Sequence, residues 1–315
     1  MRFTAQEEYY MRRALTLARR ALGLTSPNPM VGALVVKNRR VIAEGYHHHA
    51  GGPHAEIHAL NAAGKRAAGA DLYVTLEPCS THGRTPPCTD AIIAAGIRRV
   101  VVAARDPNPS HDGRGMAVLR DAGIKVEIGL LGHEAARLNE AFNKWIRTGQ
   151  PFVTVKLAMS LDGKIATRRG ESRWITGEEA RACVQELRRA ADAILVGAGT
   201  VIADDPQLTV RAGKVERQPW RVIADSGGRT PLEARVLSDE HRARTIVLTT
   251  AQSASSWRRQ LAERGVTVLE CAARDERVDL LDALKQLGGR EITGVLVEGG
   301  GQLVGSLLDQ RLVDK

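Results

Sequence analysis

Short apolar runs alternate with amphipathic segments along the whole chain, and this alternation limits the possible folds more than any other feature of the sequence. The strand-like runs cover residues 31–36, 41–44, 72–76, 99–103 and 126–128, and then 152–157, 193–196, 221–224, 245–249 and 294–298. The helix-like segments cover residues 5–22, 55–63, 89–95 and 115–122, and then 177–190, 253–264, 280–286 and 302–308. Strands that alternate with helices predict a layered α/β sheet.

The alternation is interrupted once, at Thr148-Gly149-Gln150-Pro151, which is the best candidate for a domain boundary. A chain of 315 residues suits two domains of ordinary size. We therefore expect one domain over residues 1–148 and a second over residues 149–315.

Composition excludes several classes of protein. With 43% apolar and 26% charged residues the chain is typical of a globular protein. No apolar run approaches the roughly 18 residues that a membrane span needs, and the first 20 residues lack the apolar core of a signal peptide. An aromatic content of 3% argues against a base-stacking surface for nucleic acid. We therefore expect a cytoplasmic protein that binds neither membrane nor nucleic acid.

The net charge of +9 lies mostly in the first half. Residues 1–150 contain 20 Lys and Arg against 13 Asp and Glu, whereas residues 151–315 contain 25 against 23. A basic first half suits an anionic ligand, either a phosphate or a nucleic acid. A solvated surface without any partner fits the charge equally well.

The strongest chemical pattern is His54-Ala55-Glu56 followed by Pro78-Cys79 and Cys88. One histidine and two cysteines can hold zinc and leave its fourth position open, as catalytic zinc sites do. Glu56 stands close enough to His54 to take a proton from water without ligating the metal. The pattern predicts a zinc hydrolase site, and two unrelated core cysteines are the alternative.

The spacing of the cysteines departs from the commonest form of this pattern. Zinc nucleobase deaminases carry H-x-E followed by P-C-x-x-C, whereas eight residues separate Cys79 from Cys88. The segment 78–88, Pro-Cys-Ser-Thr-His-Gly-Arg-Thr-Pro-Pro-Cys, resembles the pyrimidine deaminase domain of the RibD family of riboflavin biosynthesis. The resemblance implies a cytidine-deaminase-like α/β/α sandwich with Zn²⁺ on His54, Cys79 and Cys88, and Glu56 as the catalytic proton carrier.

The same resemblance extends to residues around the metal pattern. It implies that Asn28 and His47 line the substrate pocket of the deaminase. His82 and Arg84 lie between the two cysteines, where contact with the substrate and exposure in a solvated loop are both open interpretations.

In the second half, the strand-like run 294–298 is followed by three glycines, 299–301, and then by a helix-like segment. A strand, a glycine turn and a helix start form a nest of backbone amides that suits a nucleotide phosphate. A tight turn without a ligand is the alternative. Gly197 and Gly199 form G-x-G without a third glycine, so they do not make a dinucleotide fingerprint.

Three longer strings, 156–164, 170–176 and 200–211, resemble the RibD reductase domain, which is similar to dihydrofolate reductase. The family pattern implies that NADPH is bound by Ala158, Trp174, Thr200, Asp204, Ser226, Gly300, Gly301, Gln302, Leu303, Val304, Gly305 and Ser306. It implies that the substrate of this half is bound by Lys156, Ser172, Arg188, Leu208, Arg211 and Glu298. Arg188 and Arg211 would suit clamps on a ribose phosphate.

The resemblance covers the whole chain and implies a bifunctional enzyme. Its first step is hydrolytic deamination of 2,5-diamino-6-(5-phosphoribosylamino)pyrimidin-4(3H)-one to 5-amino-6-(5-phosphoribosylamino)uracil, and its second is NADPH-dependent reduction of the ribosyl group to ribityl. Family members continue beyond residues 305–315, so we expect a shortened reductase sheet with an open edge, and a homo-oligomer. No residue of the second half is an obvious acid or base from the sequence.

Three alternatives remain open at this point. The first is a deaminase only, whose second half is a binding or assembly module. The second is a deaminase of a base in RNA, although that class predicts a C-x-x-C pair and has no use for a nicotinamide-binding half. The third is a protein that holds zinc only to stabilise its fold.

Overall fold

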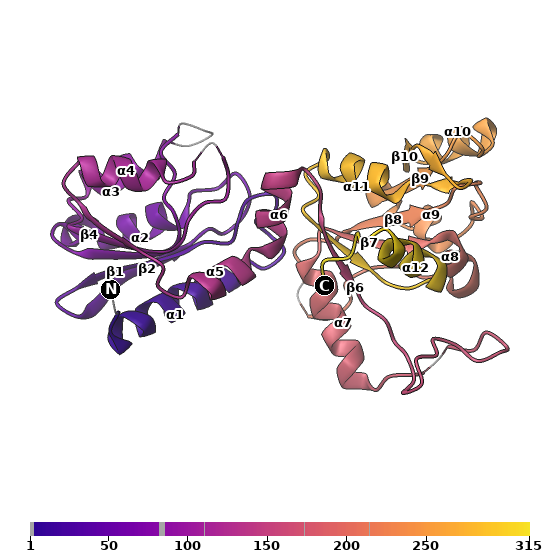
Figure 1. Ribbon diagram of the computed structural model, residues 1–315, viewed down its shortest axis with the longest axis horizontal. Coiled ribbons are helices and arrows are strands. Elements are labelled where there is room, and N and C mark those ends of the chain that lie inside the picture. The colour runs from indigo at the N-terminus through magenta and orange to yellow at the C-terminus, as the bar shows by residue number, and fades with distance from the viewer. Residues whose placement is uncertain (1–2, 82–85, 110, 173, 214) are drawn as a thin grey trace. The chain divides into compact units, whose positions relative to one another are not determined.

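The computed structural model describes residues 3–81, 86–109, 111–172, 174–213 and 215–315. The chain divides into two compact units, Met1–Thr148 and Gly149–Lys315 (Figure 1). Each unit is built on one main β-sheet with helices on both faces, so the predicted α/β class is confirmed.

The first unit contains a five-stranded mixed sheet in the order β2-β1-β3-β4-β5. β1 (Gly32–Lys37) pairs antiparallel with both β2 (Arg40–Tyr46) and β3 (Asp71–Leu76). β3, β4 (Arg99–Ala104) and β5 (Lys125–Ile128) run parallel to one another. Their carboxyl ends therefore meet at one edge of the sheet.

Helices cover both faces of this sheet. α2 (Ala55–Ala63), α3 (Cys88–Ala94) and α4 (Arg114–Asp121) pack on one face, and α1 (Ala5–Arg19) and α5 (Gly132–Leu138) pack on the other (Figure 1). The remaining helices of the unit are the 3₁₀ turn Gly64–Ala67 and α6 (Glu140–Thr148).

Alternation of side chains along the strands explains why both faces need a cover. In β3, Leu72 and Val74 pack against the α2 side of the sheet, whereas Tyr73 packs against the α1 side. Because successive strand residues point to opposite faces, the almost continuous apolar run of β3 is buried on both sides.

The second unit contains a six-stranded sheet in the order β10-β9-β8-β7-β13-β6, in which every neighbouring pair is parallel. Its strands are β6 (Phe152–Val155), β7 (Ala193–Gly197), β8 (Trp220–Ala224), β9 (Thr245–Thr249), β10 (Thr267–Glu270) and β13 (Gly294–Val297). β13 lies between β6 and β7, although it follows both in the sequence. In such open parallel sheets, ligands bind outside the carboxyl ends of the strands where the strand order changes direction.

The helices of the second unit also form two layers. α11 (Leu280–Gly288) and α12 (Gly301–Asp309) pack on one face of the sheet, and α8 (Ala198–Asp204), α9 (Arg235–Ser238) and α10 (Ser255–Glu263) pack on the other. The remaining elements are α7 (Glu178–Ala190), the 3₁₀ turn Arg242–Arg244, and a small hairpin of β11 (Ala273–Arg274) and β12 (Arg277–Val278). No helix among the described residues has both the length and the apolar character needed to cross a membrane.

The structure differs from the sequence-based expectation in a few elements. The helices α5, α6, α8 and α9 were not expected. α8 begins Ala198-Gly199, and glycine has a low intrinsic helix propensity, so packing on β7 and β8 outweighs local preference there. The edge of β6 is not fully open, because Val153 and Val155 form backbone hydrogen bonds with Asp314 and Lys315.

Candidate active sites

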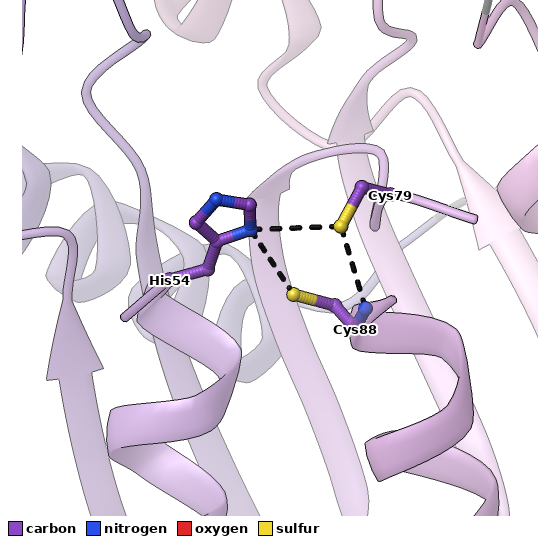
Figure 2. A group of neighbouring side chains, drawn as sticks. All are labelled: His54, Cys79 and Cys88. Atoms are coloured by element: carbon purple, nitrogen blue, oxygen red, sulfur yellow. Dashed lines mark hydrogen bonds between the residues drawn. The ribbon is translucent and has the colours of Figure 1, made fainter. Parts of the chain in front are cut away.

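Three metal-ligating side chains meet in the first unit (Figure 2). His54 immediately precedes α2, Cys79 follows the end of β3, and Cys88 is the first residue of α3. His54 Nδ1 lies 3.2 Å from Cys88 Sγ and 3.5 Å from Cys79 Sγ, and the three ligand atoms all lie within 4.8 Å of one another. The cluster therefore assembles from the amino ends of two helices and the carboxyl end of a parallel strand.

The electrostatics of the cluster suit a bound cation. Hydrogen bonding with the Cys88 thiol lowers the pKa of Cys79 to about 4, against the effect of burial, and His54 lowers it further. The Cys79 sulfur and burial in turn raise the pKa of Cys88. Without a cation, the negative charge on one sulfur therefore opposes deprotonation of the other. A bound divalent cation would allow both sulfurs to be thiolates. One imidazole nitrogen and two thiolates are a donor set that fits zinc.

Glu56 lies beside the cluster in the first turn of α2 and is only 3% exposed. Burial raises its pKa to about 7, although the nearby His54 opposes that effect. A carboxyl group that titrates near neutrality can both accept and release a proton during a reaction.

Asn28 and His47 form a hydrogen-bonded pair next to His54. His47 Nδ1 lies 3.0 Å from the carbonyl oxygen of Pro53, which can only accept, so Nδ1 carries the proton. In the neutral ring, His47 Nε2 then accepts from Asn28 Nδ2 at 3.2 Å. Burial lowers the pKa of His47 and favours this neutral form. The rings of His47 and His54 stand edge to face, 5.4 Å apart. His82 and Arg84 lie outside the described residues.

Glu77 fixes the backbone around the segment that leads to Cys79. The sequence analysis did not single it out. Its side chain is buried, and its carboxylate accepts backbone hydrogen bonds from Asp106, Gly113, Gly115 and Met116 at 3.0–3.4 Å. These bonds fix the loop before α4, and the start of α4, to the end of β3. The available signal was a glutamate placed directly between an apolar strand and Pro78-Cys79.

The second unit contains a cavity of about 1020 Å³ at the carboxyl ends of β6, β7, β8 and β13. It is lined by nine of the residues expected to bind NADPH, namely Ala158, Thr200, Asp204, Ser226, Gly300, Gly301, Gln302, Leu303 and Ser306. It is also lined by three of the residues expected to bind the substrate, namely Lys156, Ser172 and Glu298.

The glycine turn after β13 places the amino end of α12 at this cavity. Gly299 and Gly300 have φ values of 101° and 80°, a region that favours glycine. Gly300 is the N-cap of α12, and no side chain caps the helix there. The first backbone N–H groups of α12 are therefore available to an anion in the cavity.

Other expected residues lie away from the cavity. Val304 and Leu208 are buried in the core, so their side chains contribute packing. Trp174 is 73% exposed and lies against Arg181, whose guanidinium is 4.4 Å from the ring centroid. Gly305 and Arg211 do not line the cavity.

Arg188 contacts a carboxylate, where the sequence suggested a phosphate clamp. Its Nε and Nη2 donate to the two oxygens of Glu298, and its Nη1 donates to the carbonyl oxygen of Thr209 at 2.8 Å. Lys156 Nζ lies 4.0 Å from Glu298 on the cavity side. Arg188 thus holds Glu298 in place, and its guanidinium fork is already occupied.

The cavity also has lining residues that the sequence did not indicate. They come from the loop after β8, with Gly227 and Arg229, and from the β11–β12 hairpin, with Arg274 and Arg277. A glycine pair two residues after a predicted strand was the available signal for the first of these segments.

Two family models match the chain. The cytidine and deoxycytidylate deaminase zinc-binding region matches residues 4–104, and the RibD C-terminal domain matches residues 151–315. The second match spans nearly all of the second unit, so a chain with deaminase activity alone is not favoured.

Curated relatives and solved structures match nearly the whole chain. The riboflavin biosynthesis protein RibD of Aquifex aeolicus is 48% identical over 309 residues, which are 98% of this chain and 85% of the relative. The RibD protein of Escherichia coli is 45% identical over an alignment of 316 positions that covers 98% of this chain and 86% of the relative.

Among the solved structures, Acinetobacter baumannii RibD has a TM-score of 0.89 at 44% identity and covers 98% of this chain and 85% of that structure. A Thermotoga maritima structure has a TM-score of 0.86 at 44% identity and covers 97% of this chain and 84% of that structure. The latter is described as a diaminohydroxyphosphoribosylaminopyrimidine deaminase/5-amino-6-(5-phosphoribosylamino)uracil reductase. With a deaminase zinc-binding region in its first unit and a reductase domain of RibD type in its second, the chain belongs to the RibD family of riboflavin biosynthesis proteins.

Proposed function

We propose that the first unit hydrolytically deaminates 2,5-diamino-6-(5-phosphoribosylamino)pyrimidin-4(3H)-one and that the second unit reduces the ribosyl group of the resulting 5-amino-6-(5-phosphoribosylamino)uracil with NADPH. The meeting of His54, Cys79 and Cys88 beside the buried Glu56 supports the first activity most directly. The cavity at the carboxyl ends of the parallel strands supports the second.

In the deaminase unit, His54, Cys79 and Cys88 would hold the zinc ion, which supplies Lewis-acid activation of water when bound. Glu56 would accept the proton of that water and deliver it to the departing amine. Its burial keeps its pKa near neutrality, so one carboxyl group can serve both transfers. Asn28 and His47 would contact the pyrimidine, and their mutual hydrogen bond fixes the orientation of both side chains.

In the reductase unit, NADPH supplies the hydride. The glycine turn 299–301 and the start of α12 would hold the nucleotide phosphates. Glu298 and Lys156 would face the sugar, and Arg188 would keep the Glu298 carboxylate in one orientation. The unit thus contributes mainly positioning and charge complementarity.

A mass-spectrometric time course tests both activities. The zinc-loaded protein is mixed with the diaminopyrimidinone ribose phosphate and NADPH, and we expect the uracil compound to appear first and its ribityl product second. Accumulation of the ribosyl uracil alone would leave the deaminase assignment standing and remove the reductase assignment. Unchanged substrate would remove the deaminase assignment.

The Glu56→Gln variant separates a loss of catalysis from a loss of zinc binding. We expect this variant to keep its zinc, measured by metal analysis, and to lose deamination by at least roughly 100-fold. It should still reduce the ribosyl uracil when that compound is supplied directly. Deamination at the wild-type rate by this variant would show that Glu56 does not carry the proton.

We further propose that the protein works in the cytoplasm as a homo-oligomer on this small-molecule substrate, without a nucleic-acid or membrane partner. Large apolar side chains exposed along one loop of the second unit, Met159, Leu161, Ile165 and Trp174, support self-association. Light scattering of the purified protein, with and without Leu161→Ser, tests this proposal, which predicts a smaller particle for the variant.

A further inference from the structure

The side chain of Asn139 is bound to the backbone of Met30, which lies 109 positions earlier in the sequence. Its Oδ1 accepts from the Met30 N–H at 2.8 Å, and its Nδ2 donates to the Met30 carbonyl oxygen at 2.9 Å. One amide thus satisfies both backbone groups of Met30, as the opposite residue does in a hydrogen-bonded antiparallel pair. Asn139 is only 5% exposed, so water competes little for these bonds.

The backbone of Asn139 is itself fixed, because it joins two helices. Asn139 follows the last residue of α5 and precedes the first residue of α6. Its N–H donates to the carbonyl oxygen of Ala135 at 3.3 Å, and its carbonyl oxygen accepts from the N–H of Asn143 at 2.8 Å. Ala135 is buried in the core that α5 shares with α1 and the sheet. The Asn139 amide therefore extends from a packed part of the fold.

Met30 lies two residues after Asn28, in a segment with few backbone donors. Pro27 and Pro29 flank Asn28, and proline has no N–H group to donate. A segment with alternate prolines cannot pair continuously as a strand, and residues 29–31 have no regular secondary structure. The position of this segment therefore depends on bonds from side chains. Asn139 supplies two such bonds directly after Pro29.

The same segment is also tied to His47. The carbonyl oxygen of Val31 accepts from the His47 N–H at 2.9 Å, and His47 Nε2 lies 3.2 Å from Asn28 Nδ2. Asn28 and His47 are thus joined twice, once through their side chains and once through the backbone of residues 28–31. Met30 lies within this closed set of contacts, so a shift of Met30 would move the Asn28 side chain relative to His47.

We propose that Asn139 is a positioning residue of the deaminase. By holding Met30, it sets where Asn28, and through it His47, meets the pyrimidine. This role rests on the proposed deaminase function, in which Asn28 and His47 contact that ring. Asn139 itself does not touch the substrate. Its effect comes from geometry, because a displacement of about 1 Å in the groups that hold a substrate can lower the rate by roughly 100-fold.

Asn139→Ala and Asn139→Gln test this role in the zinc-loaded full chain. Alanine removes both hydrogen bonds to Met30, whereas glutamine keeps the amide and displaces it by one methylene, or about 1.5 Å. We expect kcat/KM for deamination to fall by roughly 10- to 100-fold in both variants. Zinc content and reduction of the ribosyl uracil should not change. Because glutamine still offers Met30 a partner, that variant should melt closer to the wild type than the alanine variant does.

Asn143→Ala is the matched control. Asn143 lies one helical turn after Asn139, and its Nδ2 donates to the carbonyl oxygen of Ala136 in α5 at 3.0 Å. This bond joins α6 to α5 and does not reach the segment that carries Asn28. Removal of the Asn143 side chain should therefore leave kcat/KM for deamination within about twofold of the wild type.

A double-mutant cycle separates positioning from general destabilisation. Once the Asn28 side chain is removed, Asn139 has nothing left to position. The Asn28→Ala/Asn139→Ala variant should therefore lose about as much kcat/KM for deamination as Asn28→Ala alone, whereas two independent effects would multiply. If the alanine variant of Asn139 fails to fold, Asn139→Gln takes its place in the cycle with the same expected result.

Several outcomes would overturn this role. One is a multiplied loss in the double variant, and another is deamination at the wild-type kcat/KM in either variant of Asn139. Loss of zinc together with activity would place the effect on the metal centre and not on Asn28. A zinc-loaded wild-type chain that does not deaminate the pyrimidine would remove the proposed deaminase function itself, and the role of Asn139 with it.

Discussion

Arg188 holds Glu298 through two parallel hydrogen bonds, Nε to Oε1 at 2.6 Å and Nη2 to Oε2 at 2.9 Å, although 110 positions separate them in the sequence. Both side chains are nearly buried, at 10% and 7% exposure. A bidentate pair of this kind fixes the orientation of the carboxylate as well as its charge. Glu298 lines the cavity, so its orientation bears on the proposed contact of this carboxylate with the sugar.

Arg188→Ala should therefore impair reduction while leaving deamination unchanged. Loss of one partner of a buried ion pair typically costs about 3–5 kcal/mol of stability, and it leaves Glu298 free to turn. We expect kcat for reduction to fall by roughly 100-fold, with a smaller change in KM. Arg188→Lys, which keeps the charge and loses the fork, should recover stability more than kcat. Equal losses in both activities would indicate general unfolding.

Glu77→Gln should weaken the metal centre without removing a ligand. The two carboxylate oxygens of Glu77 together accept four backbone hydrogen bonds. In glutamine only the amide oxygen can accept, because the NH₂ group is a donor. We expect a loss of about 2 kcal/mol in the free energy of unfolding and a lower affinity for zinc, measured by competition with a chelator. Unchanged zinc affinity in a destabilised variant would restrict Glu77 to a role in folding.

The three candidate metal ligands that the sequence indicated lie at the ends of strands and helices. His54, Cys79 and Cys88 stand beside short helices and a strand whose apolar periodicity is clear, and parallel strands bring such ends together. The strand order was not predictable, because the insertion of β13 between β6 and β7 depends on packing between distant segments.

The contacts that the sequence did not reveal also depend on structure that local sequence patterns do not mark. Glu77 and Arg188 act through partners that are 21 or more positions away, and no local pattern marks such a pair. The opposition of Arg274 and Arg277 depends on a positive-φ turn at Asp275 and Glu276, residues that are not glycine or asparagine. A sequence-based prediction that relies on glycine or asparagine in the turn therefore misses that hairpin.

Stability should fall in acid partly through the partly buried ion-pair cluster around Arg99. Burial alone would raise the pKa of Glu7 and Glu127, but hydrogen bonds from Thr4 and Arg99 to Glu7, and from Arg99 and Lys125 to Glu127, hold both pKa values below 4.5. A lowered folded-state pKa contributes stability that is complete above the unfolded value of 4.5 and is lost as pH falls through the folded value.

Urea unfolding between about pH 7 and about pH 3 measures this contribution. The Glu7→Gln/Glu127→Gln variant lacks both titrating groups, so its free energy of unfolding should be lower at neutral pH and should decrease less steeply toward acid than that of the wild type. Parallel curves for the two proteins would show that other carboxyl groups carry the acid sensitivity.

Gly115→Ala should destabilise the first unit, although alanine is favoured over glycine within a helix by about 1 kcal/mol. Gly115 lies in α4, and a Cβ there would stand 1.9 Å from the backbone oxygen of Pro78, so either α4 or the segment before Cys79 must move. We expect a lower melting temperature, weaker zinc binding and slower deamination, with reduction unchanged. Gly177→Ala is the matched control, because a Cβ at Gly177 meets no atom within 4 Å. A Gly115→Ala variant as stable as the wild type would mean that the contact between α4 and Pro78 adapts without cost to the metal centre.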